Sequence, residues 1–207
     1  ALTSLSCSNN QLTNLDVSGA TALTSLNCRT NSLTALDVSN NTALEYFRCD
    51  VNQLTYLNMR NGVTDQITLF NATNNSLDCI EVNAEDVDYA TTNWTNENSS
   101  IDDGATFANI CSSNPNYTYV PDDNFEQALI DLGYDDVIDD YVLTDNISAV
   151  TSLDVSEKEI SDLMGIEGFT ALTTLYSHVN QLTSLDVSAN TALTVLSCYG
   201  NDLTTLD

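Results

Sequence analysis

The chain has 207 residues, of which 30 are Asp or Glu and only four are Lys or Arg, so its formal net charge is −26. Nucleic acids and anionic membrane surfaces are not expected as partners, because binding their phosphates requires a basic surface. No apolar run approaches the roughly 18 residues of a membrane-spanning helix, so direct membrane insertion is not predicted either.

The chain starts with a repeated pattern. Residues 2–22 and 23–43 are two copies, the second of which reads LTSLNCRTNSLTALDVSNNTA, and residues 172–192 are another. The length of these copies and their frame, L-x-x-L-x-L-x-x-N-x-L, are typical of leucine-rich repeats. One turn cannot bury its apolar face alone, so neighbouring turns must stack. We therefore predict a leucine-rich repeat β-solenoid, mostly β with short coils, in which residues 1–78 are the C-terminal part of a first array.

Two residue types recur inside the frame with an expected structural role. The asparagine of each turn should hydrogen-bond the unpaired backbone of a tight turn. It recurs at Asn10, Asn31, Asn52, Asn75, Asn180 and Asn201. The cysteine at the third apolar position should act as a small buried hydrophobe, since a straight row of thiols without His does not provide the tetrahedral ligands of zinc. These cysteines are Cys7, Cys28, Cys49 and Cys198.

The repeat pattern dissolves at residues 79–111, an acidic segment that contains the only tryptophan of the chain, Trp94. Because this segment is bracketed by Cys79 and Cys111 rather than built on the frame, we predict that it forms a C-terminal cap over the last turn. Residues 112–120, which include SSNPNYT, are predicted to be a linker.

A second array is predicted to begin after the linker. Residues 121–149 are expected to form a short helical N-terminal cap, in which Asp123 caps a helix with Glu126 three residues on, and Gly133 ends that helix. The repeated turns resume, so residues 150–207 are predicted to be the start of a second array. The chain begins and ends inside a repeat, and we expect it to be a segment of a longer protein that could contain tandem copies of this unit.

The LTxLDVSxNTALTxLxCxxNQ repeat, the YVPDDNFEQALIDLGYDD helix and the LDCIEV…NW…C ending resemble the internalin-like leucine-rich repeat surface proteins of Bacteroidetes. The resemblance implies export by the type IX route, an extracellular or cell-surface location, and a role in adhesion or interaction. A disulfide between Cys79 and Cys111 would suit that location. It would close a loop of about 33 residues and stabilise the fold by roughly 3 to 4 kcal/mol.

No catalytic motif accompanies the repeats. His178 is the only histidine, and the chain has no GxSxG, HExxH or phosphate-binding glycine loop. We predict that the protein is not an enzyme and needs no cofactor. The paired aspartates at 122–123, 135–136 and 139–140 could hold a calcium ion, but none has the spacing of an EF-hand loop. Helix capping and solvated charge explain these pairs more simply.

Comparing the repeats with one another identifies a candidate ligand-binding face. The LTxLDVS half is almost constant, whereas the half around L-x-x-L-x-C-x-x-N varies at its outward positions. Such positions on a parallel sheet can recognise a ligand, although unconstrained positions also vary. The candidate residues are Arg29, Tyr46, Arg48 and Asp50 in the first array and Tyr176, His178 and Tyr199 in the second. The arginines would suit an acidic protein or glycan, and the tyrosine rings could stack on a carbohydrate.

Two other functions are considered. The chain could be a structural unit of a long surface protein or filament, because an uncapped end of such an array exposes apolar edges that favour end-to-end self-association. Thr13, Thr34 and Thr55 form a regular row of the kind that ice binding requires. However, Asp16 and Asp37 place charges on the same face, and Thr also recurs simply because it favours strands. Ice binding therefore ranks last.

Overall fold

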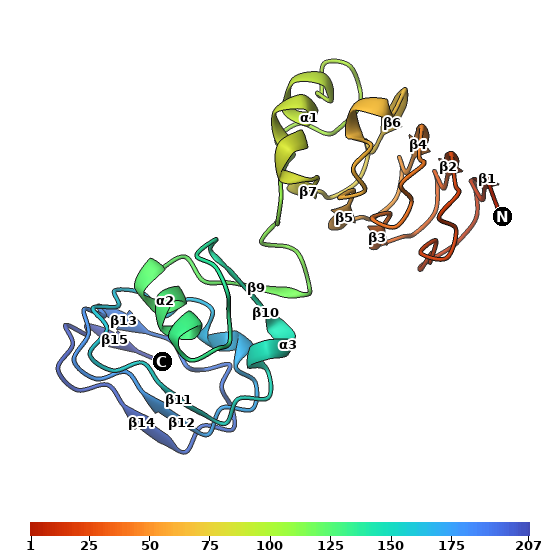
Figure 1. Ribbon diagram of the computed structural model, residues 1–207. Coiled ribbons are helices and arrows are strands. Elements are labelled where there is room, and N and C mark those ends of the chain that lie inside the picture. The colour runs from red at the N-terminus through yellow and green to blue at the C-terminus, as the bar shows by residue number, and fades with distance from the viewer. The chain divides into compact units, whose positions relative to one another are not determined.

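The computed structural model describes residues 1–207, and in it the chain forms two compact units, Ala1–Ser113 and Asn114–Asp207 (Figure 1). Both units consist mainly of short strands joined by turns, and each has its own hydrophobic core. None of the helices combines the length and the apolar character needed to cross a bilayer.

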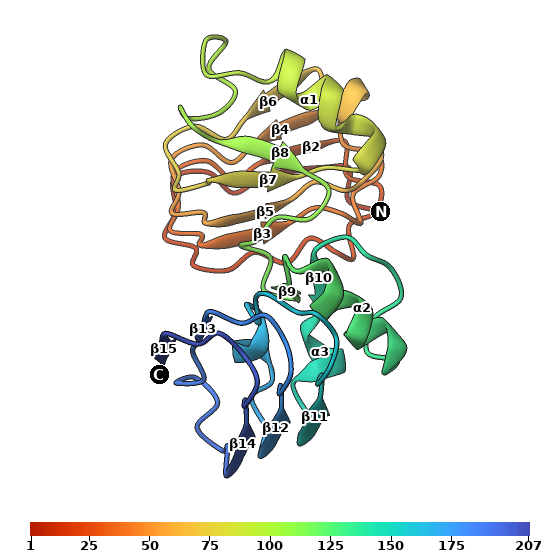
Figure 2. The same cartoon turned by 90° about the vertical axis from the view of Figure 1, so that its left-hand side faces the viewer.

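The first unit contains two parallel sheets of four strands each, and successive turns of the chain add strands to both. One sheet has the order β1 (Ser4–Ser6), β2 (Ser25–Asn27), β4 (Tyr46–Arg48) and β6 (Leu69–Asn71). The other, which faces the viewer in Figure 2, has the order β3 (Ala35–Asp37), β5 (Tyr56–Asn58), β7 (Cys79–Glu81) and β8 (Thr106–Ala108). Three short helices complete the unit, η1 (Thr64–Gln66), η2 (Ala84–Asp86) and α1 (Val87–Asn93).

Residues that pair between neighbouring strands of this unit are separated in sequence by one repeat. Leu5 pairs with Leu26, and Leu26 pairs with Phe47, so each step along the sheet is one repeat of the sequence. Phe47 pairs with Phe70, a longer step, because the connection that contains η1 has additional residues. Side chains at matching positions of successive turns therefore lie directly beside one another in the sheet.

The core of the first unit consists of the inward side chains of these strands and is closed by an aromatic cluster. Phe47 and Cys49 have no exposed surface. The ring of Trp94, which follows α1, lies with its centroid 4.4 Å from that of Phe70 and 5.9 Å from that of Phe107. Figure 1 shows α1 at the end of this unit opposite the N-terminus, so the segment after the last regular turn covers apolar side chains that would otherwise face water.

The frame asparagines connect successive turns, which confirms their predicted structural role. The side-chain amide of Asn31 donates to the backbone oxygens of Cys28 (2.9 Å) and Cys7 (3.1 Å), and its Oδ1 accepts from the backbone N–H of Leu12 (3.0 Å). The same pattern recurs at Asn52, Asn75, Asn180 and Asn201. Each asparagine thus satisfies polar backbone groups of two turns that a tight bend leaves unpaired.

The residue that immediately precedes each frame asparagine adopts a left-handed backbone conformation. It has a φ between 54° and 68° at Asn9, Thr30, Val51, Asn74, Val179 and Gly200. Gly and Asn adopt this conformation readily, whereas a β-branched residue is strained in it. Three of the six positions, Thr30, Val51 and Val179, are β-branched.

The second unit repeats this construction with fewer turns. One parallel sheet has the order β11 (Ser152–Asp154), β12 (Thr174–Tyr176) and β14 (Val195–Ser197). The other parallel sheet pairs β13 (Ser184–Leu185) with β15 (Thr205–Leu206). An antiparallel pair is formed by β9 (Tyr117–Tyr119) and β10 (Tyr141–Leu143). The helices are α2 (Asp123–Asp131), α3 (Thr144–Ile147) and η3 (Ile166–Gly168). α3 contacts β10, and the chain then enters β11, where the turns of this unit begin.

The start of α2 differs from the expected capping box. The N-cap is Asp122 rather than Asp123, because Asp122 has an extended backbone and its Oδ1 accepts from the N–H groups of Asn124 and Phe125, both at 3.0 Å. Glu126 does not return to the cap. Its side chain instead accepts backbone hydrogen bonds from the loop that precedes β10.

Part of the segment that was predicted as a linker is a strand. Residues 117–119 form β9, and Val120, which follows them, is fully buried. β9 also packs closely on η3, since a Cβ atom added to Gly168 would lie 2.6 Å from Oγ1 of Thr118. The chain from Asn114 onward therefore belongs to the second unit.

Candidate ligand-binding face

The structure places the candidate residues on the outward side of two sheets. In β4, Tyr46 and Arg48 flank the buried Phe47, and in β12 Tyr176 follows the buried Leu175. The other four candidates all lie two residues before the frame asparagine of their own turn. They are Arg29 and Asp50 in the first unit and His178 and Tyr199 in the second. Because the register joins matching positions, each of these two pairs is in contact.

In the first unit the candidates form an ion-pair cluster. Asp50 is only 3% exposed, and its carboxylate accepts from Nε (2.9 Å) and an η nitrogen (3.0 Å) of Arg48. Nε of Arg29 lies 3.4 Å from the same carboxylate, which is an ionic contact without hydrogen-bond geometry. The hydrogen bond to Asp50 raises the pKa of Arg48. Both guanidinium groups are thus already directed at a carboxylate of the protein, which counts against the predicted attraction of an acidic ligand.

In the second unit the candidates form an exposed row of rings, which we call the aromatic row: Tyr176, His178 and Tyr199. The rings of His178 and Tyr199 are stacked with centroids 4.6 Å apart and planes 13° apart. This separation matches the spacing of adjacent strands. Tyr176 meets His178 edge to face at 6.4 Å. Tyr199 is 65% exposed, and the stacking contact with His178 holds its ring in place.

Apolar side chains extend the surface around the aromatic row. Val179, next to His178, is 46% exposed, and Val195 on β14 is 45% exposed. Two hollows of the molecule lie away from this row. One of about 450 Å³ is bordered by residues 162–167 and 184–189, and another lies beside Trp94. The aromatic row is therefore an open surface, which suits a macromolecular ligand better than a small molecule that needs enclosure.

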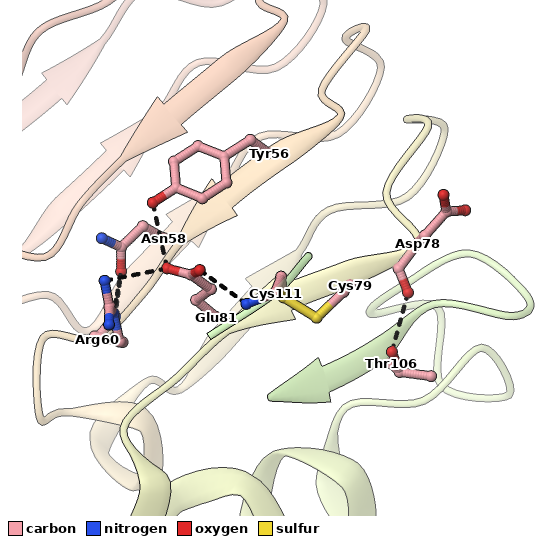
Figure 3. The surroundings of a disulfide bond; sticks show 8 residues. All are labelled: Tyr56, Asn58, Arg60, Asp78, Cys79, Glu81, Thr106 and Cys111. Carbon is pink, nitrogen blue, oxygen red and sulfur yellow. Dashed lines mark hydrogen bonds and ion pairs between the residues drawn. A yellow bond between two sulfur atoms is a disulfide. The ribbon is translucent and has the colours of Figure 1, made fainter. Parts of the chain in front are cut away.

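Cys79 and Cys111 form the predicted disulfide, and Figure 3 shows the polar cluster beside it. Glu81 is fully buried. Its carboxylate accepts from the backbone N–H of Cys111 (3.0 Å) and the hydroxyl of Tyr56 (3.2 Å), and it pairs with Arg60 (3.3 Å). Burial and the charge of Glu81 raise the pKa of Tyr56. This cluster fastens Cys111 and β7 to β5 and to Arg60, which follows β5. The repeat pattern does not indicate this role for Tyr56, Arg60 and Glu81.

The remaining cysteines are free thiols in or beside the core. Cys28 and Cys49 are fully buried, while Cys7 and Cys198 are partly buried in turns near the two ends of the chain. Burial raises the pKa of Cys28 to about 12, and the neighbouring Cys7 adds to the shift. A thiol with so high a pKa is not ionised at neutral pH and is a poor nucleophile, as expected for a packing role.

Part of the chain is similar in sequence to an internalin. No model of a known protein family matches the chain. Internalin J of Listeria monocytogenes serotype 4b (strain F2365) is 36% identical over 73 residues, which are 35% of this chain and 8% of that protein. The solved functional domain of InlJ from Listeria monocytogenes, described as including a cysteine ladder, aligns with 100% of this chain and 46% of that one, at 24% identity and a TM-score of 0.33. The relation to internalin J rests on the 73-residue match.

Proposed function

We propose that the chain is a non-enzymatic interaction module of an extracellular or cell-surface protein, and that it binds a protein ligand through the aromatic row. The observation that carries the proposal is the exposed stack of His178 and Tyr199 with Tyr176 at its edge. Tyrosine rings are frequent energetic centres of protein interfaces, because they bury a large area at a small cost in side-chain entropy.

The proposal also covers the fold class of the two units and their caps. Both units are leucine-rich repeat solenoids, the first with a C-terminal cap at residues 79–111 and the second with a helical N-terminal cap at residues 121–149. In the first unit, the register of one repeat per turn supports the solenoid, and the packing of Trp94 on Phe70 supports the C-terminal cap. The similarity to internalin J supports the solenoid and the surface location. An origin in Bacteroidetes stays a prediction.

The surroundings of the aromatic row restrict the chemistry of the partner. Val179 and Val195 add aliphatic surface next to the rings, which favours a protein partner with an apolar patch over a carbohydrate. The strongly acidic chain would favour a basic rim around that patch, since charge complementarity steers association.

The test compares the wild-type chain with a Tyr176→Ala/Tyr199→Ala variant on an array of purified extracellular proteins and on a glycan array. A Ser184→Ala/Thr205→Ala variant, changed at exposed positions of the other sheet of the same unit, is the control. If the row is the binding site, a protein partner bound by wild type and control should bind the tyrosine variant at least about 30-fold more weakly, as expected for loss of interface hot spots.

Three results would contradict the proposal in different ways. Equal binding by the tyrosine variant would place the site elsewhere. Binding to glycans alone would replace the protein ligand with a carbohydrate. Concentration-dependent end-to-end oligomers in light scattering, without a foreign partner, would favour the structural role in a long surface protein or filament.

A further inference from the structure

A compact acidic cluster lies where α2 meets the loop before β10. Asp123 and Glu126 belong to the first turn of α2, and Asp140 immediately precedes β10. One carboxylate oxygen from each of these residues can be chosen so that all three lie within 4.8 Å of one another. Oxygens that ligate one calcium ion at 2.3 to 2.6 Å lie no farther apart than about 5 Å. The three carboxylates therefore fit the coordination shell of a single ion.

Glu126 provides an independent sign that a ligand is needed. Its side chain is fully buried. Oε1 accepts from the backbone N–H groups of Asp139 (2.9 Å) and Tyr141 (3.1 Å), whereas Oε2 is buried without a hydrogen-bond partner. A buried carboxylate oxygen without a partner is costly, so this oxygen requires either a proton or a cation.

The charges around Glu126 make a cation the better partner. Asp135 adds negative charge beside Glu126, and Asp136 and Asp140 add it beside Asp139. Lys158 is the only Lys or Arg of the second unit, and its Nζ pairs with Asp131, 3.2 Å away on the exposed side of α2. Nothing basic in this unit thus neutralises the cluster.

Asp122 is not part of the cluster. One of its oxygens caps α2, and the other accepts from the backbone N–H groups of Ser161 and Asp162 and from the Ser161 hydroxyl. Its carboxylate is fully used by the protein, in contrast to Glu126.

We propose that Asp123, Glu126 and Asp140 bind one calcium ion, which joins the start of α2 to the loop ahead of β10. Three carboxylates and no His or Cys define a site for a hard cation. A surface loop that supplies one of the ligands suits the variable coordination of calcium better than the rigid octahedron of magnesium. The positions in the chain are not those of an EF-hand loop, which is why the spacing of the aspartates does not reveal the site.

Calcium titration of the full chain by calorimetry, after treatment with chelator, tests the site. We expect one calcium ion per chain and a higher unfolding midpoint of the second unit in calcium than in EDTA. Terbium(III), which substitutes for calcium, should show emission sensitised by the neighbouring Tyr141, and calcium should displace it. Magnesium should bind at least about tenfold more weakly.

Variants separate the proposed ligands from the general acidity of the chain. Glu126→Gln keeps an acceptor for the two backbone N–H groups but removes the charge, and should abolish calcium binding. Asp123→Asn changes an exposed side chain, so the fold should persist while affinity falls by about tenfold or more. Asp131→Asn, on the same helix but paired with Lys158, is the matched control and should bind calcium like wild type.

Absence of calcium binding by the folded wild-type chain would overturn the proposal and indicate that Glu126 is protonated instead. Equal losses in Asp123→Asn and Asp131→Asn would also overturn it, because binding would then reflect diffuse charge. Equal affinity for magnesium would refute the assignment to calcium.

Discussion

Removing the carboxylate of Asp122 should destabilise the second unit. Its Oδ1 accepts from the N–H groups of Asn124 and Phe125, and its Oδ2 accepts from the N–H of Ser161 (2.9 Å), the hydroxyl of Ser161 (2.6 Å) and the N–H of Asp162 (3.0 Å). One carboxylate therefore both caps α2 and fastens this helix to a turn about 40 residues away in sequence.

The magnitude of the Asp122→Ala effect follows from these bonds. Loss of an N-cap costs about 1 kcal/mol. A hydrogen bond to a charged acceptor contributes about 1.5 kcal/mol at the lower end of its range, and some of the three bonds from Ser161 and Asp162 will be replaced by water. We expect the free energy of unfolding of the second unit to fall by about 4 kcal/mol.

Hydrogen exchange followed by mass spectrometry is the appropriate assay, because peptides from α2 and from residues 159–164 report on this unit alone. Asp145→Asn, which alters an exposed aspartate, is the control. A loss below about 1 kcal/mol in Asp122→Ala would refute the reasoning, since it would mean that water replaces all five bonds at little cost.

The same residue predicts a dependence on pH. Burial raises the pKa of Asp122, but the hydrogen bonds from Ser161, Phe125 and Asp162 outweigh burial and hold the pKa below its ordinary value. The stabilisation should therefore be fully present above the unfolded-state pKa of about 3.9 and be lost as the pH falls through the lower folded-state pKa. Stabilities of wild type and Asp122→Ala should converge in that acidic range, and a constant difference would contradict the assignment.

Three further changes have clear expected outcomes in the first unit. Val51→Asn should raise the free energy of unfolding by about 1 kcal/mol, because Val51 is exposed and has a φ of 59°; a lower urea midpoint would contradict this. Asn31→Ala should lower it by about 2 kcal/mol, since the N–H of Leu12 loses its acceptor, and an unchanged midpoint would exclude the structural role. Replacing Cys79 and Cys111 by Ala should lower it by about 4 kcal/mol through loss of loop closure; a reductant should destabilise wild type but not this variant.

The periodicity of the sequence predicts most of the repeated structure. Successive leucines in matching positions, such as Leu5 and Leu26, are paired in the sheet, because a fixed repeat length allows one register to bury every turn. The inward cysteines and the bridging asparagines follow from the same frame. Where the sequence departs from the fixed repeat length, the register departs with it, since the step from Phe47 to Phe70 is longer than the step from Leu26 to Phe47.

Features that depend on contacts between distant, non-repeated segments were not predicted. The strand β9 pairs with β10, from which α2 separates it in the sequence, and nothing in SSNPNYT indicates that partner. Both Asp122 and Asp123 have the local chemistry of an N-cap, and the choice between them is made by Ser161 and Asp162, which only the folded chain brings near. The partners of Glu126 lie in a loop whose course the sequence pattern does not determine.

The two halves of the candidate face show why one repeated position leads to different chemistry. Arg29 and Asp50 occupy the same position of successive turns as His178 and Tyr199 do, so in both cases the register forces contact. Opposite charges in contact satisfy each other and leave little for a ligand. The stacked rings of His178 and Tyr199 carry no opposite charges that would neutralise each other. Pairs of residues one repeat apart are therefore more informative about binding than single variable positions, since contact between neighbours decides which groups remain available.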